Sequence, residues 1–248
     1  MSAFYPLDVE DDTDQTSTNI YLHTVPRADI LSSSPKCVLF SPKFCLNVSR
    51  NFSIREKVRM NRDSCFKVYD MMSDLNNKAA DASSTTELFK VSNPVNSIRG
   101  KHVITHVNGD DLVKIKKKLL SVHPIWHMNG GSKLESRLAT LVFELTLLKK
   151  KAHVYQYEHP YPNEDDDTNY EHIKPSLLIK SDNTARDFKV FDALGTEVFA
   201  TITKRQHGNS ELLVETDNYT VTVNPGVDVL FMISLALMYQ FAISDSET

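Results

Sequence analysis

The sequence is poor in glycine. Only seven of its 248 residues are Gly, whereas about 7% is the usual share in globular proteins. None of the seven forms GxxxxGK[ST] or GxGxxG, the patterns with which common nucleotide-binding loops hold phosphate groups. Gly-x-Ser-x-Gly and His-Glu-x-x-His, the motifs of serine hydrolases and zinc proteases, are absent as well. We therefore expect a protein that is not an enzyme and needs no cofactor or metal.

Cysteine is also scarce. The chain has an odd number of cysteines, Cys37, Cys45 and Cys65, and no two of them have the CxxC spacing of metal or redox sites. The first residues lack the basic and apolar regions of a signal peptide. We expect an intracellular protein with reduced thiols: cytoplasmic, with a peripheral membrane or nuclear location left open.

Acidic residues outnumber basic ones, and the formal net charge is −4. Because no basic stripe with interspersed aromatic residues is present, nucleic acid is not an expected partner. Five of the acids lie in residues 1–19, which have no apolar period, and we expect this segment to be a disordered tail. Residues 20–248 are expected to form a single domain.

Short apolar segments with a period of two follow one another along the chain, and turn residues separate them. The clearest signal is Asn108-Gly109, which lies between the alternating runs 103–107 and 112–116 and predicts a β-hairpin. The remaining expected strands are 66–70, 88–91, 141–148, 153–159, 177–180, 188–190, 198–202, 212–214 and 219–223. Many short strands separated by turns indicate an all-β barrel or sandwich.

The last segment has a different pattern. Asn224-Pro225 resembles a helix start, with Asn at the N-cap and Pro at the first helical position, and Asp228 follows in the first turn. Residues 229–243 are apolar on every side, which is typical of a helix buried in a protein or in a membrane. The polar residues Asp228, Ser234 and Gln240, and the lack of a flanking basic cluster, favour a buried core helix over residues 225–243 rather than a transmembrane span.

A short sequence occurs twice. Phe66-Lys-Val-Tyr-Asp70 has a counterpart in Phe188-Lys-Val-Phe-Asp192, and each copy is followed by another apolar strand. Two similar halves suggest a duplicated sheet that closes around an apolar filler, and the C-terminal helix is the candidate for that filler. In the first copy the turn expands into residues 71–87, which are rich in Asn, Asp, Ser and Thr.

These segments, together with 102–126 and 219–228, resemble the LURP-one-related family over about residues 40–244. That family is similar to the tubby C-terminal and phospholipid scramblase group. The resemblance implies a twelve-stranded β-barrel, built from two similar halves and threaded by a central C-terminal helix. It also implies binding of acidic membrane lipids. The chain departs from the family pattern in the insertion 71–87 and in the acidic loop 163–168.

Basic residues gather in the middle of the chain: residues 101–151 contain ten Lys and Arg but only four acids. On a strand, Lys114, Lys116 and Lys118 share one face, opposite the apolar residues of the same run. Lys149, Lys150 and Lys151 form a second group. Such a pattern is typical of a solvated barrel face that discourages edge pairing, but it also suits a surface that binds acidic lipid headgroups.

The sequence gives less support to other candidate functional groups. Asp70 and Asp192 occupy equivalent repeat positions, where they are expected to cap turns rather than act as acid and base. His153 and His159 alternate with tyrosines on one strand face, but no third metal ligand is placed by spacing.

Three functions stay open. The first is a non-enzymatic barrel that binds acidic lipid headgroups of the phosphoinositide type. The second is a protein-interaction scaffold without lipid binding, and the third is a scramblase-like lipid mover, which requires the helix to leave the barrel.

Overall fold

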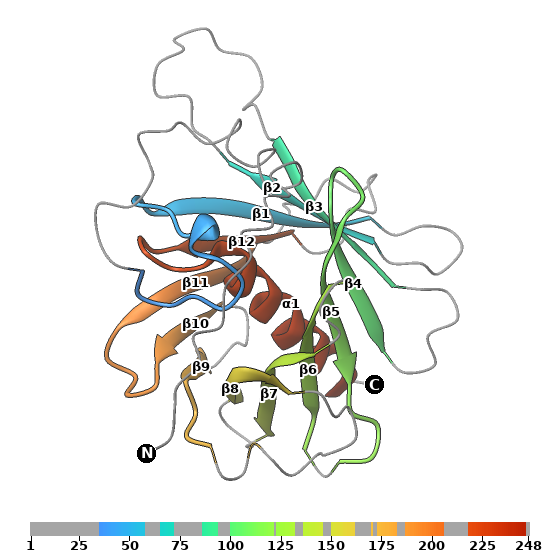
Figure 1. Ribbon diagram of the computed structural model, residues 1–248, viewed down its shortest axis with the longest axis vertical. Coiled ribbons are helices and arrows are strands. Elements are labelled where there is room, and N and C mark those ends of the chain that lie inside the picture. Colours follow the sequence, from blue (N-terminus) through green and yellow to red (C-terminus); the bar gives the residue numbers. More distant parts are fainter. Residues whose placement is uncertain are drawn as a thin grey trace, which may run out of the picture.

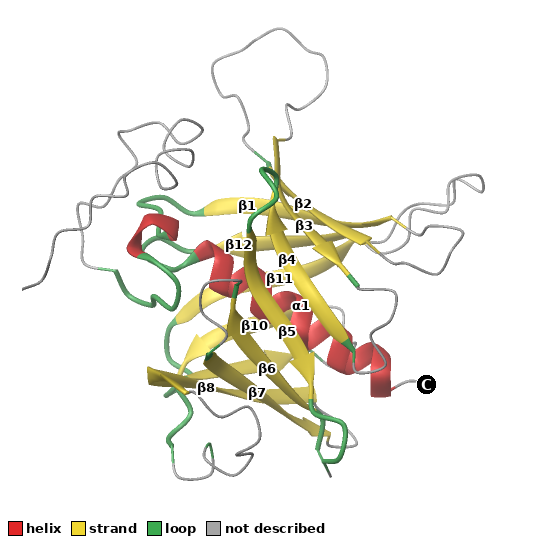
Figure 2. Ribbon diagram, turned by 45° about the vertical axis from the view of Figure 1, so that its right-hand side comes forward, coloured by secondary structure: helices red, strands yellow, loops and turns green. Residues whose placement is uncertain are grey.

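In the part of the chain that the structure describes, twelve antiparallel strands form a closed barrel around one helix (Figures 1 and 2). The computed structural model describes residues 35–57, 65–71, 86–93, 100–121, 123–131, 136–145, 150–161, 170, 173–182, 187–205 and 218–246. The strands are β1 (Arg50–Lys57), β2 (Cys65–Asp70), β3 (Thr86–Ser92), β4 (Lys101–His106), β5 (Asp111–Lys117), β6 (Ile125–Gly130), β7 (Arg137–Leu145), β8 (Lys150–Tyr161), β9 (Leu177–Ser181), β10 (Asp187–Asp192), β11 (Val198–Arg205) and β12 (Asn218–Val223). A short 3-10 helix, η3 (Pro42–Phe44), precedes the strands, and α1 (Val229–Ser246) follows them. The expected all-β barrel with a buried C-terminal helix is confirmed.

Each strand pairs with its neighbour in the chain, and β1 pairs with β12 to close the ring. The barrel therefore has two ends. At the entry end β12 stops at Val223 and α1 begins at Val229. At the exit end α1 finishes, and Asp245 near its last turn lies 2.9 Å from the ammonium group of Lys117 at the end of β5. Because neighbouring strands run in opposite directions, the β5–β6 and β7–β8 connections both lie at the exit end.

The helix fills the barrel. Every residue of α1 from Val229 to Tyr239 is buried, as expected of a helix that is apolar all round. Leu230, Ile233 and Leu237 are at most 2% exposed, and Figure 2 shows α1 passing through the ring of strands. Among the described residues, no helix is long and apolar enough to cross a bilayer.

The start of the helix was predicted four residues too early. Asp228, and not Asn224, is the N-cap, since its carboxylate accepts a hydrogen bond from the Phe231 N–H at 3.1 Å. Gly226 has φ +78, a left-handed conformation that a helix cannot include. The side chain of Asn224 instead donates a hydrogen bond to the carbonyl of Val198 at 2.7 Å.

The repeated sequence lies in two hairpins of the same design. Its copies are on β2 and β10, and each pairs with the next strand of the chain. The register shifts between Val68 and Tyr69 in the first copy, and between Val190 and Phe191 in the second. Equivalent positions therefore carry equivalent β-bulges, which increase the local twist near a barrel rim. The two copies lie four strands apart around the ring.

Several expected elements differ from the structure. Strands β1 and β6 were not anticipated, because β1 is rich in charge and every residue of β6 is buried, so neither shows a clean alternation. Glu87, expected within the insertion, belongs to β3, where its carboxylate lies 2.6 Å from the Lys67 ammonium group. The tail 1–19, most of the insertion, the acidic loop 163–168 and the expected strand 212–214 lie outside the described residues.

Aromatic side chains of β4, β6 and α1 pack together at the exit end. The imidazole of His102 on β4 stacks on Phe241 of α1, with ring centroids 3.8 Å apart, and Trp126 packs against the same phenyl ring at 5.7 Å. Burial lowers the pKa of His102 from 6.5 to about 4, although the charge of Asp245 acts in the opposite direction. The buried imidazole is therefore neutral at pH 7.

We predict that α1 determines the stability of the barrel. Leu237→Ala removes a fully buried side chain and should lower the free energy of unfolding by about 2–5 kcal/mol, whereas Leu237→Met should cost less than about 1.5 kcal/mol. Leu237→Asp buries an unpaired charge and should give insoluble or unfolded protein. Urea unfolding followed by circular dichroism measures the first two, and a chain ending at Asn224 that still melts cooperatively as a monomer would contradict the prediction.

We also predict that His102 contributes to acid sensitivity. A base with a lowered pKa in the folded state gives stability that is complete above pH 6.5 and is lost as pH falls towards 4. The loss amounts to about 3 kcal/mol at pH 4. His102→Phe retains an aromatic ring beside Phe241 but cannot be protonated. Urea midpoints measured from pH 7 to pH 4 should therefore fall less steeply for this variant than for the wild type, and parallel curves would rule out the contribution.

Candidate functional site

The candidate lysines of β5 lie on the outside of the barrel. Val113 and Ile115 are fully buried and face the core, whereas Lys114 and Lys116 are partly exposed and alternate with them. The strand is hydrogen-bonded to β4 on one side and β6 on the other, so the backbone beneath both lysines is fixed. The alternation expected from the sequence is confirmed for these two residues.

The structure adds a lysine to this face. Lys101 on β4 stands directly opposite Lys116 in the strand register, and Val103 stands opposite Lys114. Lys101 is partly exposed and alternates with the buried His102, so it shares the outer surface. We call the outer side chains Lys101, Lys114 and Lys116 the β4–β5 lysine face.

Lys118 lies just beyond this face, at the exit end. It follows the last residue of β5, and its backbone N–H donates a hydrogen bond to the carbonyl of Ile125 at 2.8 Å. The side chain is partly exposed. Lys117, which the alternation places on the opposite side from Lys116, instead forms the ion pair with Asp245 of α1.

The second lysine group belongs to a different part of the ring. Lys149 lies outside the described residues, and Lys150 and Lys151 begin β8. Strand β8 is three strands from β5 in a closed ring of twelve, which is a quarter of the circumference. The outer surfaces of β6 and β7 lie between them, so the two groups do not form one continuous side face.

Lys151 has other basic neighbours. In the strand register it stands opposite Lys180 on β9, which stands opposite Lys189 on β10. Lys180 and Lys189 are exposed. The ammonium group of Lys151 is 3.8 Å from a Glu144 carboxylate oxygen, and that of Lys180 lies 5.1 Å from the centre of the Phe191 ring. These three residues form a second row, which we call the β8–β10 lysine row.

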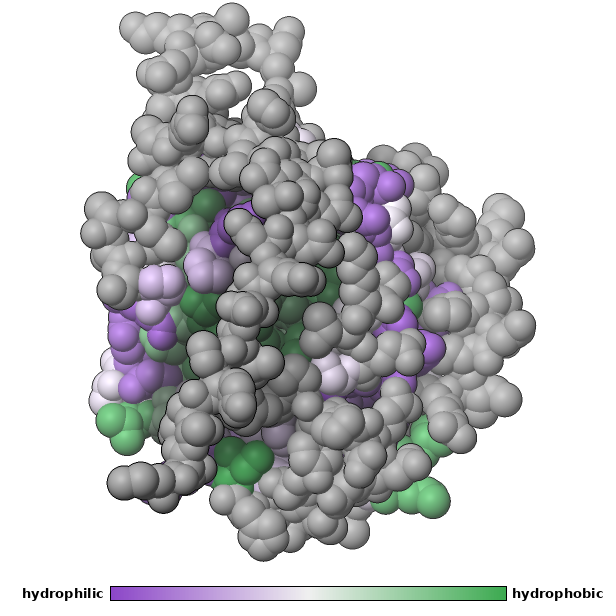
Figure 3. Space-filling model, viewed as in Figure 1, coloured by the Kyte–Doolittle hydropathy of each residue, from purple (hydrophilic) through white to green (hydrophobic). Residues whose placement is uncertain are grey.

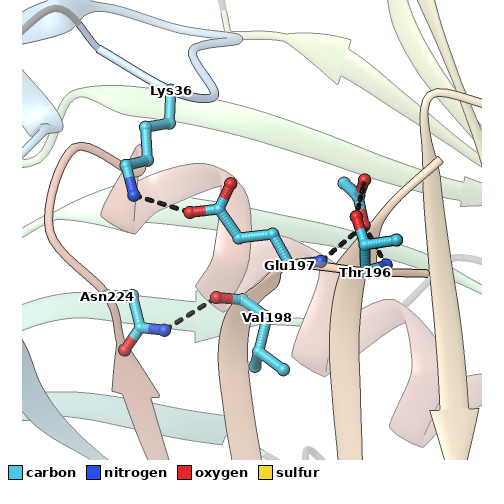
Figure 4. Close-up of polar contacts among 6 residues, drawn as sticks. Lys36, Thr196, Glu197, Val198 and Asn224 are labelled. Atoms are coloured by element: carbon cyan, nitrogen blue, oxygen red, sulfur yellow. Dashed lines mark hydrogen bonds and ion pairs between the residues drawn. The ribbon is translucent and has the colours of Figure 1, made fainter. Parts of the chain in front are cut away.

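The two candidate carboxylates have structural roles, and Figure 4 shows Thr196 and Glu197, which donate hydrogen bonds to one of them. Asp192 accepts hydrogen bonds from the backbone N–H groups of Thr196 and Glu197, at 2.6 and 2.8 Å, and from the Thr196 hydroxyl. These bonds lower its pKa and close the β10–β11 turn, as expected. Asp70 differs, because it forms an ion pair with the Arg50 guanidinium at 3.0 Å. Burial raises the pKa of Asp70, and the Arg50 charge opposes that rise.

His153 is hydrogen-bonded, and the cysteines Cys37 and Cys45 are buried. His153 hydrogen-bonds to Glu144 at 3.0 Å, and burial lowers its pKa. Burial, and then the charge of Asp228, raises the pKa values of Cys37 and Cys45 to about 12, so both thiols are protonated at neutral pH. Within the described residues, no group of three or more potential metal ligands occurs.

The register between strands explains why three lysines of these surfaces were not predicted from the sequence. Lys101, Lys180 and Lys189 are separated in sequence from the lysines that they face, and no local pattern reveals which strands pair or at which residues. The nearest available signal was the hairpin at Asn108-Gly109, whose two arms place Lys101 opposite Lys116.

Comparison with known proteins gives a consistent result. The family model described as LURP-one-related matches residues 50–240. Protein LURP-one-related 15 of Arabidopsis thaliana is 25% identical over 223 residues, covering 88% of this chain and 93% of the relative. Protein LURP-one-related 10 of the same plant is 24% identical over 200 residues, with coverages of 81% and 93%. An X-ray structure of an Arabidopsis thaliana protein superimposes with a TM-score of 0.51 at 20% identity, covering 82% of this chain and 96% of that one.

Proposed function

The chain belongs to the LURP-one-related family, and on this basis we propose that it is a non-enzymatic module that binds acidic phospholipid headgroups, of the phosphoinositide type, at the surface of a cytoplasmic membrane. Lys114, Lys116 and Lys118 are the proposed contacts. Lys149, Lys150 and Lys151 are the proposed contacts of a second edge.

The observation that carries this proposal is the β4–β5 lysine face. Lys114 and Lys116 extend outward from a strand whose alternate residues, Val113 and Ile115, are fully buried. Lys101 adds a third ammonium group from the neighbouring strand. Adjacent strands are about 4.8 Å apart, so the three side chains start close enough together to reach one polyphosphorylated headgroup.

Lysine is suited to this task. Its ammonium group acts as a compact charge that needs no fixed bidentate geometry, so several lysines can adapt to differently placed phosphates. Each lysine near an anionic leaflet contributes about 1 kcal/mol of attraction at moderate ionic strength. The overall charge of −4 opposes attraction of the whole molecule, which favours one oriented contact over general adhesion.

Other features support binding rather than catalysis or transport. The two described thiols are buried and protonated, and Asp70 and Asp192 are engaged in an ion pair and a turn. A lipid mover of the scramblase type requires α1 to leave the barrel, which would expose the fully buried residues of that helix to water. A protein-interaction scaffold would not need these lysines. The experiment below distinguishes that function from lipid binding.

We predict that charge reversal on β5 weakens lipid binding. Lys114→Glu/Lys116→Glu should reduce flotation with vesicles containing 5% phosphatidylinositol bisphosphate at least about tenfold, since two positive charges become negative and the net charge at the contact falls by four units. Wild-type binding should also fall as salt rises from 0.1 to 1 M, because the Debye length shrinks from about 10 to about 3 Å.

A charge-matched control separates a defined surface from net charge. Lys43 in η3 and Lys174 between β8 and β9 are exposed, so Lys43→Glu/Lys174→Glu gives the same change in net charge away from β5. This variant should float like the wild type. An equal loss of flotation in both variants would contradict a defined binding face. If the wild type does not float with the vesicles, lipid binding is wrong and the interaction scaffold is the function that stays open.

A further inference from the structure

Two adjacent leucines are exposed at the exit end of the barrel. In the turn between β5 and β6, the side chains of Leu119 and Leu120 are 53% and 93% exposed. The other exposed large apolar residues in the described part of the chain are single and lie in segments at the entry end: Val48, Val107 and Leu194. Lone exposed leucines are ordinary. A pair that directly follows three consecutive lysines, Lys116 to Lys118, is a different pattern.

The turn that carries the leucines is held on both sides. The backbone N–H of Lys118 donates to Ile125, and the carbonyl of the neighbouring Pro124 accepts a hydrogen bond from the Phe143 N–H at 3.0 Å. The Ser121 hydroxyl donates to the carbonyl of His123 across the turn. The two ends of the leucine segment are therefore tied to the barrel, at Lys118 and at Pro124.

Charge converges on the same end. Lys118 follows the last residue of β5 and Lys150 is the first residue of β8, and the antiparallel order of the intervening strands brings both to the exit end. On the sides of the barrel the two lysine groups are a quarter of the circumference apart. The exit end is thus the surface on which both groups and the exposed leucines can meet a flat partner together.

Figure 3, viewed as in Figure 1, shows hydrophobic side chains protruding at the lower right of the molecule. In Figure 1 strand β5 runs down towards that side, and α1 ends there as well. Hydrophilic surface lies above and beside these side chains in the same view.

The geometry points to the β5–β6 turn as an anchor that inserts Leu119 and Leu120 into the interface of an anionic bilayer, while the lysines around it contact lipid phosphates. The barrel would then stand on its exit end. This inference rests on the proposed acidic-lipid binding and specifies how the molecule docks. An anionic bilayer is the partner that fits both observations, since its phosphates match the lysines and its acyl boundary accepts apolar side chains.

The first experiment compares two leucines of similar exposure. Leu194, in the β10–β11 turn, is 84% exposed and lies at the entry end, so Leu194→Gln is a matched control for Leu120→Gln. Partitioning onto vesicles of phosphatidylcholine with 30% phosphatidylserine and 5% phosphatidylinositol bisphosphate should fall about tenfold for Leu120→Gln. It should be unchanged for Leu194→Gln. Thermal unfolding of both variants checks that the fold is retained.

Salt separates the leucine contribution from the lysine contribution. Lys114→Glu/Lys116→Glu should remove the part of binding that salt weakens, whereas Leu120→Gln should remove the part that persists at 0.5 M salt, because apolar insertion is not screened. If Leu120→Gln binds like the wild type, the anchor is wrong while acidic-lipid binding stands. If the wild type does not bind, both proposals fail.

A spectroscopic test reports insertion directly. The native Trp126 is 1% exposed and faces the core, so it supplies a constant background for an added tryptophan. Leu120→Trp should show a blue-shifted emission on anionic vesicles and quenching by brominated acyl chains. Binding without either change would overturn the anchor, since the turn would then lie outside the acyl boundary.

Discussion

The barrel depends on the helix inside it. A ring of about eight strands is just wide enough for its own inward side chains to fill the interior, and this ring has twelve. The additional width requires a filler, and an α-helix with side chains is about 10–12 Å across. The apolar surface of α1 on all sides is therefore a geometric requirement, because every strand that faces it needs an apolar partner.

A buried carboxylate fixes where that helix starts. One oxygen of the fully buried Asp228 accepts N–H groups from Leu39, Phe40 and Ser41 at 2.8–3.3 Å, and the other accepts that of Phe231. The same residue forms a backbone bridge with Cys45. Four donors compensate a charge that is costly to bury unpaired. The segment before β1 and the first turn of α1 are thereby joined, although they are nearly 190 residues apart in sequence.

The sequence predicted those features that a local pattern determines. The period of two located β4 and β5, Asn108-Gly109 located the turn between them, and the continuous apolar run identified α1 as the core helix. The start of α1 was misplaced, because Asn224-Pro225 matches a helix start locally, whereas three of the four donors that hold the Asp228 carboxylate come from the distant residues 39–41. The candidate site was predicted only in part for the same reason: Lys114 and Lys116 share a face by alternation, but Lys101 joins them through register.

The pairing of β1 with β12 has a consequence for how the chain acquires its fold during synthesis. Arg50 pairs with Val223, so closure of the ring joins residues 173 positions apart, whereas the other strand pairings join consecutive strands. Because α1 follows all twelve strands, the ribosome synthesises the filler only after the whole ring, at about 5–20 residues per second. Until then the inward faces of all twelve strands have no helix to cover them. A nascent chain of this design exposes aggregation-prone apolar surface for seconds, which is the situation in which chaperones bind.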